Sequence, residues 1–194
     1  RLEFTDAVPS AVITFRWPGP AGNNRQTVIR DMAGLALSVG ENAFDNQLVV
    51  KQKVASSVYA GWESGRLGGT FTLYAAAGPG ISAKQLESAL LSAFETARKS
   101  GVTPAVIKTV QADFESGYVS VPSNPLSYAF ALAGAAKDVD PRDWRFELEI
   151  SRTVKAEDIN SALASLAPEK AQVSIIEPGP RSKDYPPVIA QSSG

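Results

Sequence analysis

The chain alternates between short runs of β-branched and aromatic residues and longer stretches with helical periodicity. Residues 11 to 17 form one such run, which Pro18-Gly19-Pro20 interrupts, and this pattern predicts a strand. From about Asn24 to Val39, apolar residues recur every three or four positions, which predicts an amphipathic helix. A second, shorter helix is predicted from about Asn42 to Lys53.

The middle of the chain predicts a hairpin followed by a long helix. Two β-rich runs, residues 56 to 63 and 69 to 77, are joined by a loop that contains two glycines. Ser82 and Gln85 have the spacing of a capping box, in which each side chain bonds the backbone of the other. The helix that they begin is predicted to end near Gly101.

Helices dominate the later part of the predicted fold. A polar residue before a proline is typical of a helix start, because the first helical position needs no N–H. Three such starts are Thr103-Pro104, Asn124-Pro125 and Asp140-Pro141. A further helix from about 156 to 166 and a strand from 171 to 176 complete the domain, expected at residues 1 to 178, and residues 179 to 194 are expected to form a flexible tail.

This order of elements predicts an α+β fold. The expected architecture is a largely antiparallel β-sheet covered on one face by helices, because blocks of helices follow the strands instead of alternating with them. Trp17, Trp62 and Trp144 lie among apolar neighbours and are expected in or at the edge of the core. The acidic residues Glu147, Glu149, Glu157 and Asp158 are expected on solvent-facing sides of helices.

Composition narrows the class of function. The 194-residue chain is 44% hydrophobic and 20% charged, which is ordinary for a folded domain. Its 19 Lys and Arg balance 20 Asp and Glu, so nucleic acid is not an expected partner. No run of about 18 apolar residues occurs, so no membrane span is expected. The chain begins at Arg1, and we expect that it was cut from a longer precursor.

The sequence contains neither histidine nor cysteine. Zinc peptidases bind their metal through imidazole, and serine and cysteine hydrolases commonly use imidazole as the base. These chemistries are therefore excluded for the chain alone, and no metal site and no catalytic residue are assigned. A Ser–Lys dyad is left open by composition, although no Ser-x-x-Lys stands at a strand-to-helix turn.

Two local features offer weak binding chemistry. Gly78-Pro79-Gly80 precedes a helix start, where free N–H groups hold anions, but neither a Walker lysine nor G-x-G-x-x-G is present, so a simple turn is the favoured interpretation. The cluster Lys51-Gln52-Lys53 suits the contact of a peptide carbonyl or carboxylate. On composition alone, the favoured interpretation is the solvated C-terminus of a helix, where cations are favoured.

Several short sequence segments, and their order along the chain, resemble the insulinase/pitrilysin/mitochondrial-processing-peptidase family of zinc proteases. A helix end that leads into a strand, a hairpin strand, a Pro/Gly turn, a Gly-Val-Thr helix opening and a Val-x-Ala-Glu-Asp phrase each have a counterpart here. They are residues 48–59, 69–74, 77–80, 100–104 and 154–159, and the likeness extends over residues 8 to 178. Members have two related α+β halves, of which one carries a His-x-x-Glu-His helix and the other closes over the substrate.

In the substrate-closing half of that family, an Arg and a Tyr seven residues apart often contact the peptide near the scissile bond. Tyr59 stands at the tyrosine position, but Gln52 stands where the family has arginine. Glutamine lacks the fixed charge that would stabilise an oxyanion, and Lys51 or Lys53 is a candidate substitute. The resemblance thus implies Tyr59, Gln52, Lys51 and Lys53 as peptide-binding residues.

The resemblance implies a non-catalytic domain that pairs with a zinc-bearing half, on the same precursor or a separate subunit, and helps to enclose a peptide. Zinc is then expected in the partner half and no cofactor in this chain. The alternative is a purely structural assembly subunit of the same fold without substrate contact. A bacterial periplasm or cell envelope location fits the absence of cysteine, but the sequence does not fix the compartment.

Overall fold

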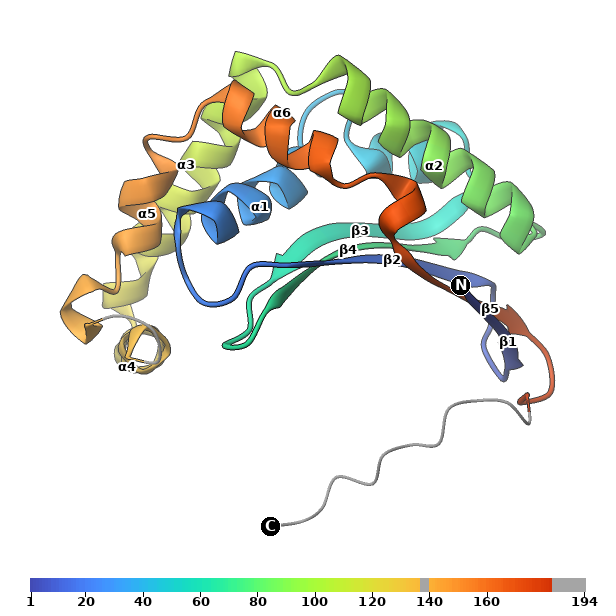
Figure 1. The fold of residues 1–194 in the computed structure, drawn as a ribbon, viewed down its shortest axis with the longest axis horizontal. Helices are drawn as coiled ribbons and strands as arrows, with labels where there is room; N and C mark the ends of the chain where they lie inside the picture. The colour runs from blue at the N-terminus through green and yellow to red at the C-terminus, as the bar shows by residue number, and fades with distance from the viewer. Residues whose placement is uncertain (137–139, 183–194) are drawn as a thin grey trace, which may run out of the picture.

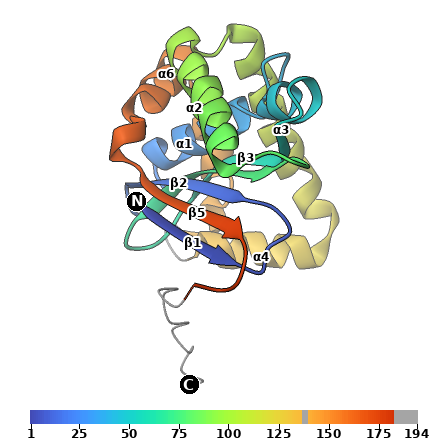
Figure 2. The ribbon, with the colours of Figure 1, turned by 90° about the vertical axis from the view of Figure 1, so that its right-hand side faces the viewer.

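A computed structural model describes residues 1–136 and 140–182 as two layers, a five-stranded sheet with helices on one of its faces (Figure 1). The strands lie in the order β1-β5-β2-β4-β3, and only β1 and β5 pair in parallel. They are β1 (Leu2–Asp6), β2 (Val12–Gly19), β3 (Ala55–Glu63), β4 (Gly69–Ala77) and β5 (Gln172–Pro178). Figure 2 shows β1, β5 and β2 side by side beneath α2 and α6. The predicted α+β class and largely antiparallel sheet are confirmed.

The helical layer contains six α-helices and several shorter helical turns among the described residues. The α-helices are α1 (Arg25–Ala36), α2 (Ala83–Ser100), α3 (Pro104–Ser120), α4 (Pro125–Ala135), α5 (Phe146–Ser151) and α6 (Ala156–Ser165). The others are the π-helix η1 (Asp45–Lys51) and the 3₁₀ turns η2 (Val121–Ser123), η3 (Pro141–Asp143) and η4 (Pro168–Lys170). None of the helices described is long and apolar enough to cross a lipid bilayer.

Helix starts follow the predicted capping chemistry in most cases. Ser82 and Gln85 form the expected capping box at the start of α2, and α2 ends at Gly101. Thr103 and Asn124 cap α3 and α4 through their side-chain oxygens. Asp140 likewise accepts the backbone N–H of Arg142, but the helix that starts there is only the three-residue 3₁₀ turn η3, and α5 begins at Phe146.

Two local predictions needed correction. The helix expected from about Asn42 to Lys53 is the shorter π-helix η1, whose wider turn is uncommon and often occurs at functional positions. Strand β1 was not predicted at all. Among the described strands it pairs with β5 alone, at the other end of the chain, so no local turn signal marks it.

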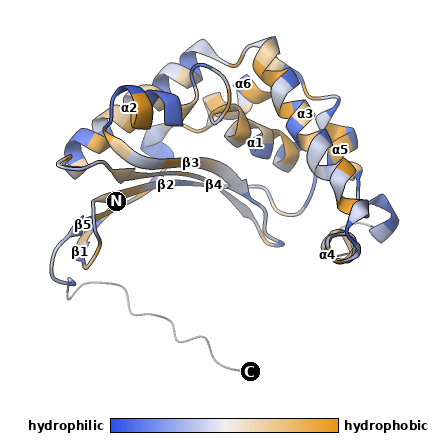
Figure 3. Ribbon diagram, turned by 180° about the vertical axis from the view of Figure 1, so that it is seen from behind, coloured by the Kyte–Doolittle hydropathy of each residue, from blue (hydrophilic) through white to orange (hydrophobic). Residues whose placement is uncertain are grey.

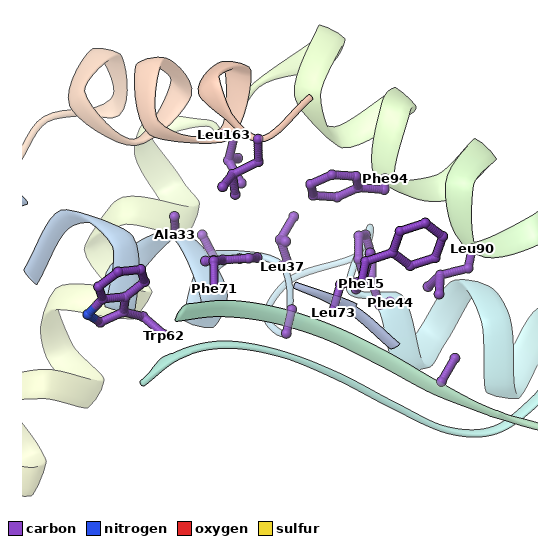
Figure 4. Close-up of a cluster of buried hydrophobic side chains, with 14 of the residues drawn as sticks. Phe15, Ala33, Leu37, Phe44, Trp62, Phe71, Leu73, Leu90, Phe94 and Leu163 are labelled. Atoms are coloured by element: carbon purple, nitrogen blue, oxygen red, sulfur yellow. The ribbon is translucent and has the colours of Figure 1, made fainter. Parts of the chain in front are cut away.

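The core lies between the sheet and the helical layer (Figure 4). Phe15, Phe71 and Leu73 project from the sheet, and Leu90 and Phe94 of α2 meet them with at most 2% of their surface exposed. Burial of each such side chain contributes roughly 1.5–3 kcal/mol. The three tryptophans expected in or near the core are buried, with 3–8% of their surface exposed.

Helix α1 packs directly on the backbone of the edge strand β3. A Cβ placed on Gly34 would lie 2.7 Å from the Cα of Gly61 and 3.0 Å from the carbonyl oxygen of Ala60. The first distance is shorter than Cβ atoms adopt in proteins and the second is unusually tight, so glycine at position 34 is what permits the approach.

The sheet bends away from the helices at both ends, and its second face is open and concave (Figure 1). Figure 3, from behind, shows the same two layers with the helices on one side only. Among the described residues, no helix covers the open face.

Two segments lie at the margins of this body. In α4, Leu126 and Phe130 expose 66% and 69% of their surface. Gly179 and Ser182, at the beginning of the expected tail, donate backbone hydrogen bonds to Asp6 and Thr5 of β1. The rest of that segment, residues 183–194, lies outside the described residues.

Candidate functional site

The open face of the sheet is lined mainly by polar side chains. In β4, Phe71, Leu73 and Ala75 belong to the core, so the alternate residues face away from the helices. The cross-strand register extends this face to the neighbouring strands. Its central residues are Thr14, Arg16, Tyr59, Gly61, Thr70, Thr72, Tyr74 and Gln172.

Tyr59 lies on this open face, in the edge strand β3. Its side chain is 48% exposed, and it stands directly opposite Tyr74 of β4. Partial burial, and then the carboxylates of Glu63 and Asp31, raise the pKa of its hydroxyl. Tyr59 therefore keeps its proton at neutral pH and can donate a hydrogen bond to a peptide carbonyl or carboxylate.

The other three predicted residues lie where η1 ends. Lys51 is the last residue of η1, and the backbone N–H of Gln52 donates to the carbonyl of Gln47 at 3.0 Å. Lys53 has φ 54°, the left-handed conformation that a residue with a Cβ rarely adopts. All three side chains are exposed.

Gln52 faces a cavity of about 440 Å³ in the helical layer. The cavity lies between the end of α1, η1, α2 and the beginning of α3, and Glu41 is its only charged lining residue among the described residues. Tyr59 is not among its lining residues. The five strand residues from Ala55 to Tyr59 also span about 13 Å. Gln52 and Tyr59 thus belong to different surroundings.

A second polar cluster joins α1, α3 and α5. The hydroxyl of Tyr118 donates to the carboxylate of Glu147 at 2.5 Å, and both residues line a cavity of about 710 Å³. Burial and the nearby Glu147 carboxylate raise the pKa of Asp31 to about 6. Glu147 is half-buried and hydrogen-bonded, so its prediction as a solvent-facing residue is wrong.

The sequence reasoning did not single out Thr72 or Arg16. Thr72 is 7% exposed, and its hydroxyl is buried without a hydrogen-bond partner, the one such side-chain atom in residues 1–136 and 140–182. Arg16 is exposed on β2 and stands opposite Thr72. Only the pairing of β2 with β4 brings them together, and no local motif signals it.

Neither the sequence nor the described part of the structure offers a zinc site. The chain has no histidine and no cysteine. Within residues 1–136 and 140–182, no three His, Cys, Asp or Glu side chains are grouped so that they could hold a metal ion. The chain by itself therefore lacks the ligands with which zinc peptidases bind their metal.

Comparison with known proteins places the fold. No family model and no curated protein matches the sequence. Solved structures do match. A protease from Helicobacter pylori superposes with a TM-score of 0.81 at 17% identity, over 91% of this chain and 43% of that one. The M16 peptidase inactive domain from Pseudomonas fluorescens gives a TM-score of 0.72 at 14% identity, over 93% of this chain and 42% of that one.

The chain has the peptidase M16 fold. The inactive peptidase domain of a predicted zinc protease from Bordetella parapertussis also shares it, with a TM-score of 0.76 at 16% identity, over 94% of this chain and 98% of that one. The fold match agrees with the resemblance to insulinase-type proteases found in the sequence. This chain spans less than half of the first of these M16-fold proteins and almost all of the Bordetella domain.

Proposed function

We propose that this chain is a non-catalytic peptidase-like domain that pairs with a zinc-bearing half and helps to enclose an extended peptide. The observation that supports the proposal is an open, concave sheet face, with the exposed Tyr59 on it, in an M16 fold that has no histidine. Since the chain has no imidazole, the hydrolytic metal belongs to the partner, which carries His-x-x-Glu-His. The partner is part of the same precursor or a separate subunit.

A second candidate function is assembly alone, without contact to the substrate. Gln52 favours it, because this uncharged residue replaces the arginine of the family pattern and faces a cavity in the helical layer. Under this alternative, Tyr59 has no role in turnover.

The two candidates predict different kinetics for the native pair. The experiment is to tag the chain in its native host, purify it with its partner, and measure hydrolysis of a fluorogenic peptide with and without a chelator. We expect chelator-sensitive turnover by the pair and none by the isolated chain. Chelator-sensitive hydrolysis by the isolated chain would refute the proposal.

Single substitutions then separate peptide contact from scaffolding. Tyr59→Phe removes one hydroxyl, and the loss of one hydrogen bond of about 1 kcal/mol lowers kcat/KM about fivefold. Gln52→Ala is measured in parallel, and Tyr128→Phe serves as the control because it removes a tyrosine hydroxyl from helix α4, outside the sheet. If both Tyr59→Phe and Gln52→Ala leave turnover unchanged, the scaffold role is favoured.

A further inference from the structure

A row of four residues, three of them with hydrogen-bond donors in their side chains, crosses the middle of the open face. The register places Gly61 of β3 opposite Thr72 of β4, Thr72 opposite Arg16 of β2, and Arg16 opposite Gln172 of β5. Neighbouring strands lie about 4.8 Å apart, so Gly61 and Arg16 stand roughly 10 Å from each other with Thr72 between them.

The hydroxyl of Tyr59 joins this row. Tyr59 and Gly61 point to the same face, two residues apart on β3. A Cβ placed on Gly61 would lie only 2.2 Å from the Tyr59 hydroxyl oxygen, so the tyrosine side chain lies along the strand and over the glycine. The absence of a side chain at Gly61 is what allows the hydroxyl to reach the row.

Thr72 supplies the observation that points to a ligand. Only 7% of its surface is exposed, and its hydroxyl has no hydrogen-bond partner. Buried polar groups in proteins nearly always have a partner, and an exception calls for an explanation. On an otherwise open face, a bound group that accepts the hydroxyl proton provides that explanation.

Arg16 defines the charge of that group. It is the only Lys or Arg in the five strands, and it is exposed. No ion pair to Arg16 occurs in the part of the chain that the structure describes. The acidic residues that share its face, Asp6 and Glu63, stand at strand ends. The centre of the open face is therefore locally cationic.

We propose that Arg16, the Thr72 and Tyr59 hydroxyls and the Gln172 amide bind a carboxylate group of a peptide. A guanidinium has only donors, and hydroxyls and an amide supply further donors, whereas a carboxylate accepts at two oxygens. The proposal rests on the proposed function, because it names the chemistry by which the enclosed peptide is held. The carboxylate belongs either to the peptide C-terminus or to an Asp or Glu side chain.

Direct binding to the intact chain, without a partner and without turnover, tests this proposal separately from the proposed function. A short, fluorescently labelled Ala/Ser peptide with one central Glu is prepared in four forms, with Glu or Gln at the centre and with a free or amidated C-terminus. Its dissociation constant is measured by fluorescence anisotropy. We expect one of the two carboxylate replacements to weaken binding at least about tenfold. The replacement that does so identifies which carboxylate is bound.

Variants then assign the binding to the row. Arg16→Gln is expected to remove the preference for the carboxylate, and Arg66→Gln, which removes an exposed cation on the β3–β4 loop, is expected to leave it intact. Thr72→Val is expected to weaken binding about fivefold, and Thr72→Ser, which keeps a hydroxyl, is expected to restore it. Circular dichroism confirms folding of each variant.

Three outcomes would overturn the proposal. They are no binding by the intact chain, equal binding of all four peptide forms, and an equal loss of binding in Arg16→Gln and Arg66→Gln. A negative result of this kind leaves pairing with a zinc-bearing half to be judged by purification and chelator sensitivity.

Discussion

Replacing Thr72 with valine should stabilise this domain. Threonine and valine have nearly the same shape, so the substitution removes the hydroxyl and leaves the branched side chain on β4. Because that hydroxyl is buried without a partner, its desolvation is not offset by a hydrogen bond in the free protein. An unsatisfied buried polar group costs about 1–3 kcal/mol. We expect the free energy of unfolding to rise by about 1–2 kcal/mol, since the environment relaxes in part.

Thermal and urea denaturation, followed by circular dichroism, measure this change. For chains of roughly 150–250 residues, 1 kcal/mol corresponds to about 2–4 °C in Tm. The expected increase is therefore roughly 2–8 °C. Thr14→Val is the matched control, because Thr14 lies on the same face, is 8% exposed, and its hydroxyl is not among the buried atoms without a partner.

A Thr72→Val variant that is less stable than the wild type, or that behaves like Thr14→Val, would refute this reasoning. Either result means that the Thr72 hydroxyl has a partner in the free protein. Together with weaker peptide binding, an increase in stability would show that residue 72 was selected for binding at a cost in stability.

Two further predictions concern charge and backbone conformation. Asp31→Asn should leave the free energy of unfolding unchanged below pH 4 and raise it by about 1–2 kcal/mol above pH 6, a value that is discounted for partial exposure. Urea denaturation at both pH values measures the difference. The sign follows because the pKa of Asp31 is raised to about 6 in the folded protein, so the wild-type protein loses stability as the pH rises from about 4 to 6. An equal effect of the substitution at both pH values would contradict this prediction. Lys53→Gly should raise the free energy of unfolding by about 0.5–1 kcal/mol because Lys53 is left-handed, whereas Lys51→Gly, within η1, should lower it. A loss of stability in both variants in the same denaturation assay would count against this interpretation.

Local signals in the sequence predicted much of the helical layer. The capping box at Ser82, the Asn124-Pro125 pair and the hairpin around residues 64–68 each depend on side chains close in sequence, and the structure has them where they were expected. The π-helical winding of η1 was not predictable in this way, because the same apolar spacing fits an α-helix.

Features that depend on long-range pairing could not be read from the sequence. Strand β1 is defined by its parallel ladder with β5. The shared row of Arg16 and Thr72 likewise depends on the register of β2 against β4, and a slip of one residue would turn Thr72 toward the core. The resemblance to the peptidase family predicted Tyr59 as a peptide-binding residue, but it did not predict that Gln52 faces a separate cavity.

The contact between Gly34 and the backbone of Gly61 has a mechanical consequence. Because no side chain separates the two backbones, α1 cannot move closer to β3 without a steric clash. Because α3, α5 and α6 also pack on α1, a shift of these helices toward the sheet would press α1 against the strand that carries Tyr59. Tyr59 is therefore coupled through α1 to the outer helices, and a partner that moved those helices would also reposition its side chain.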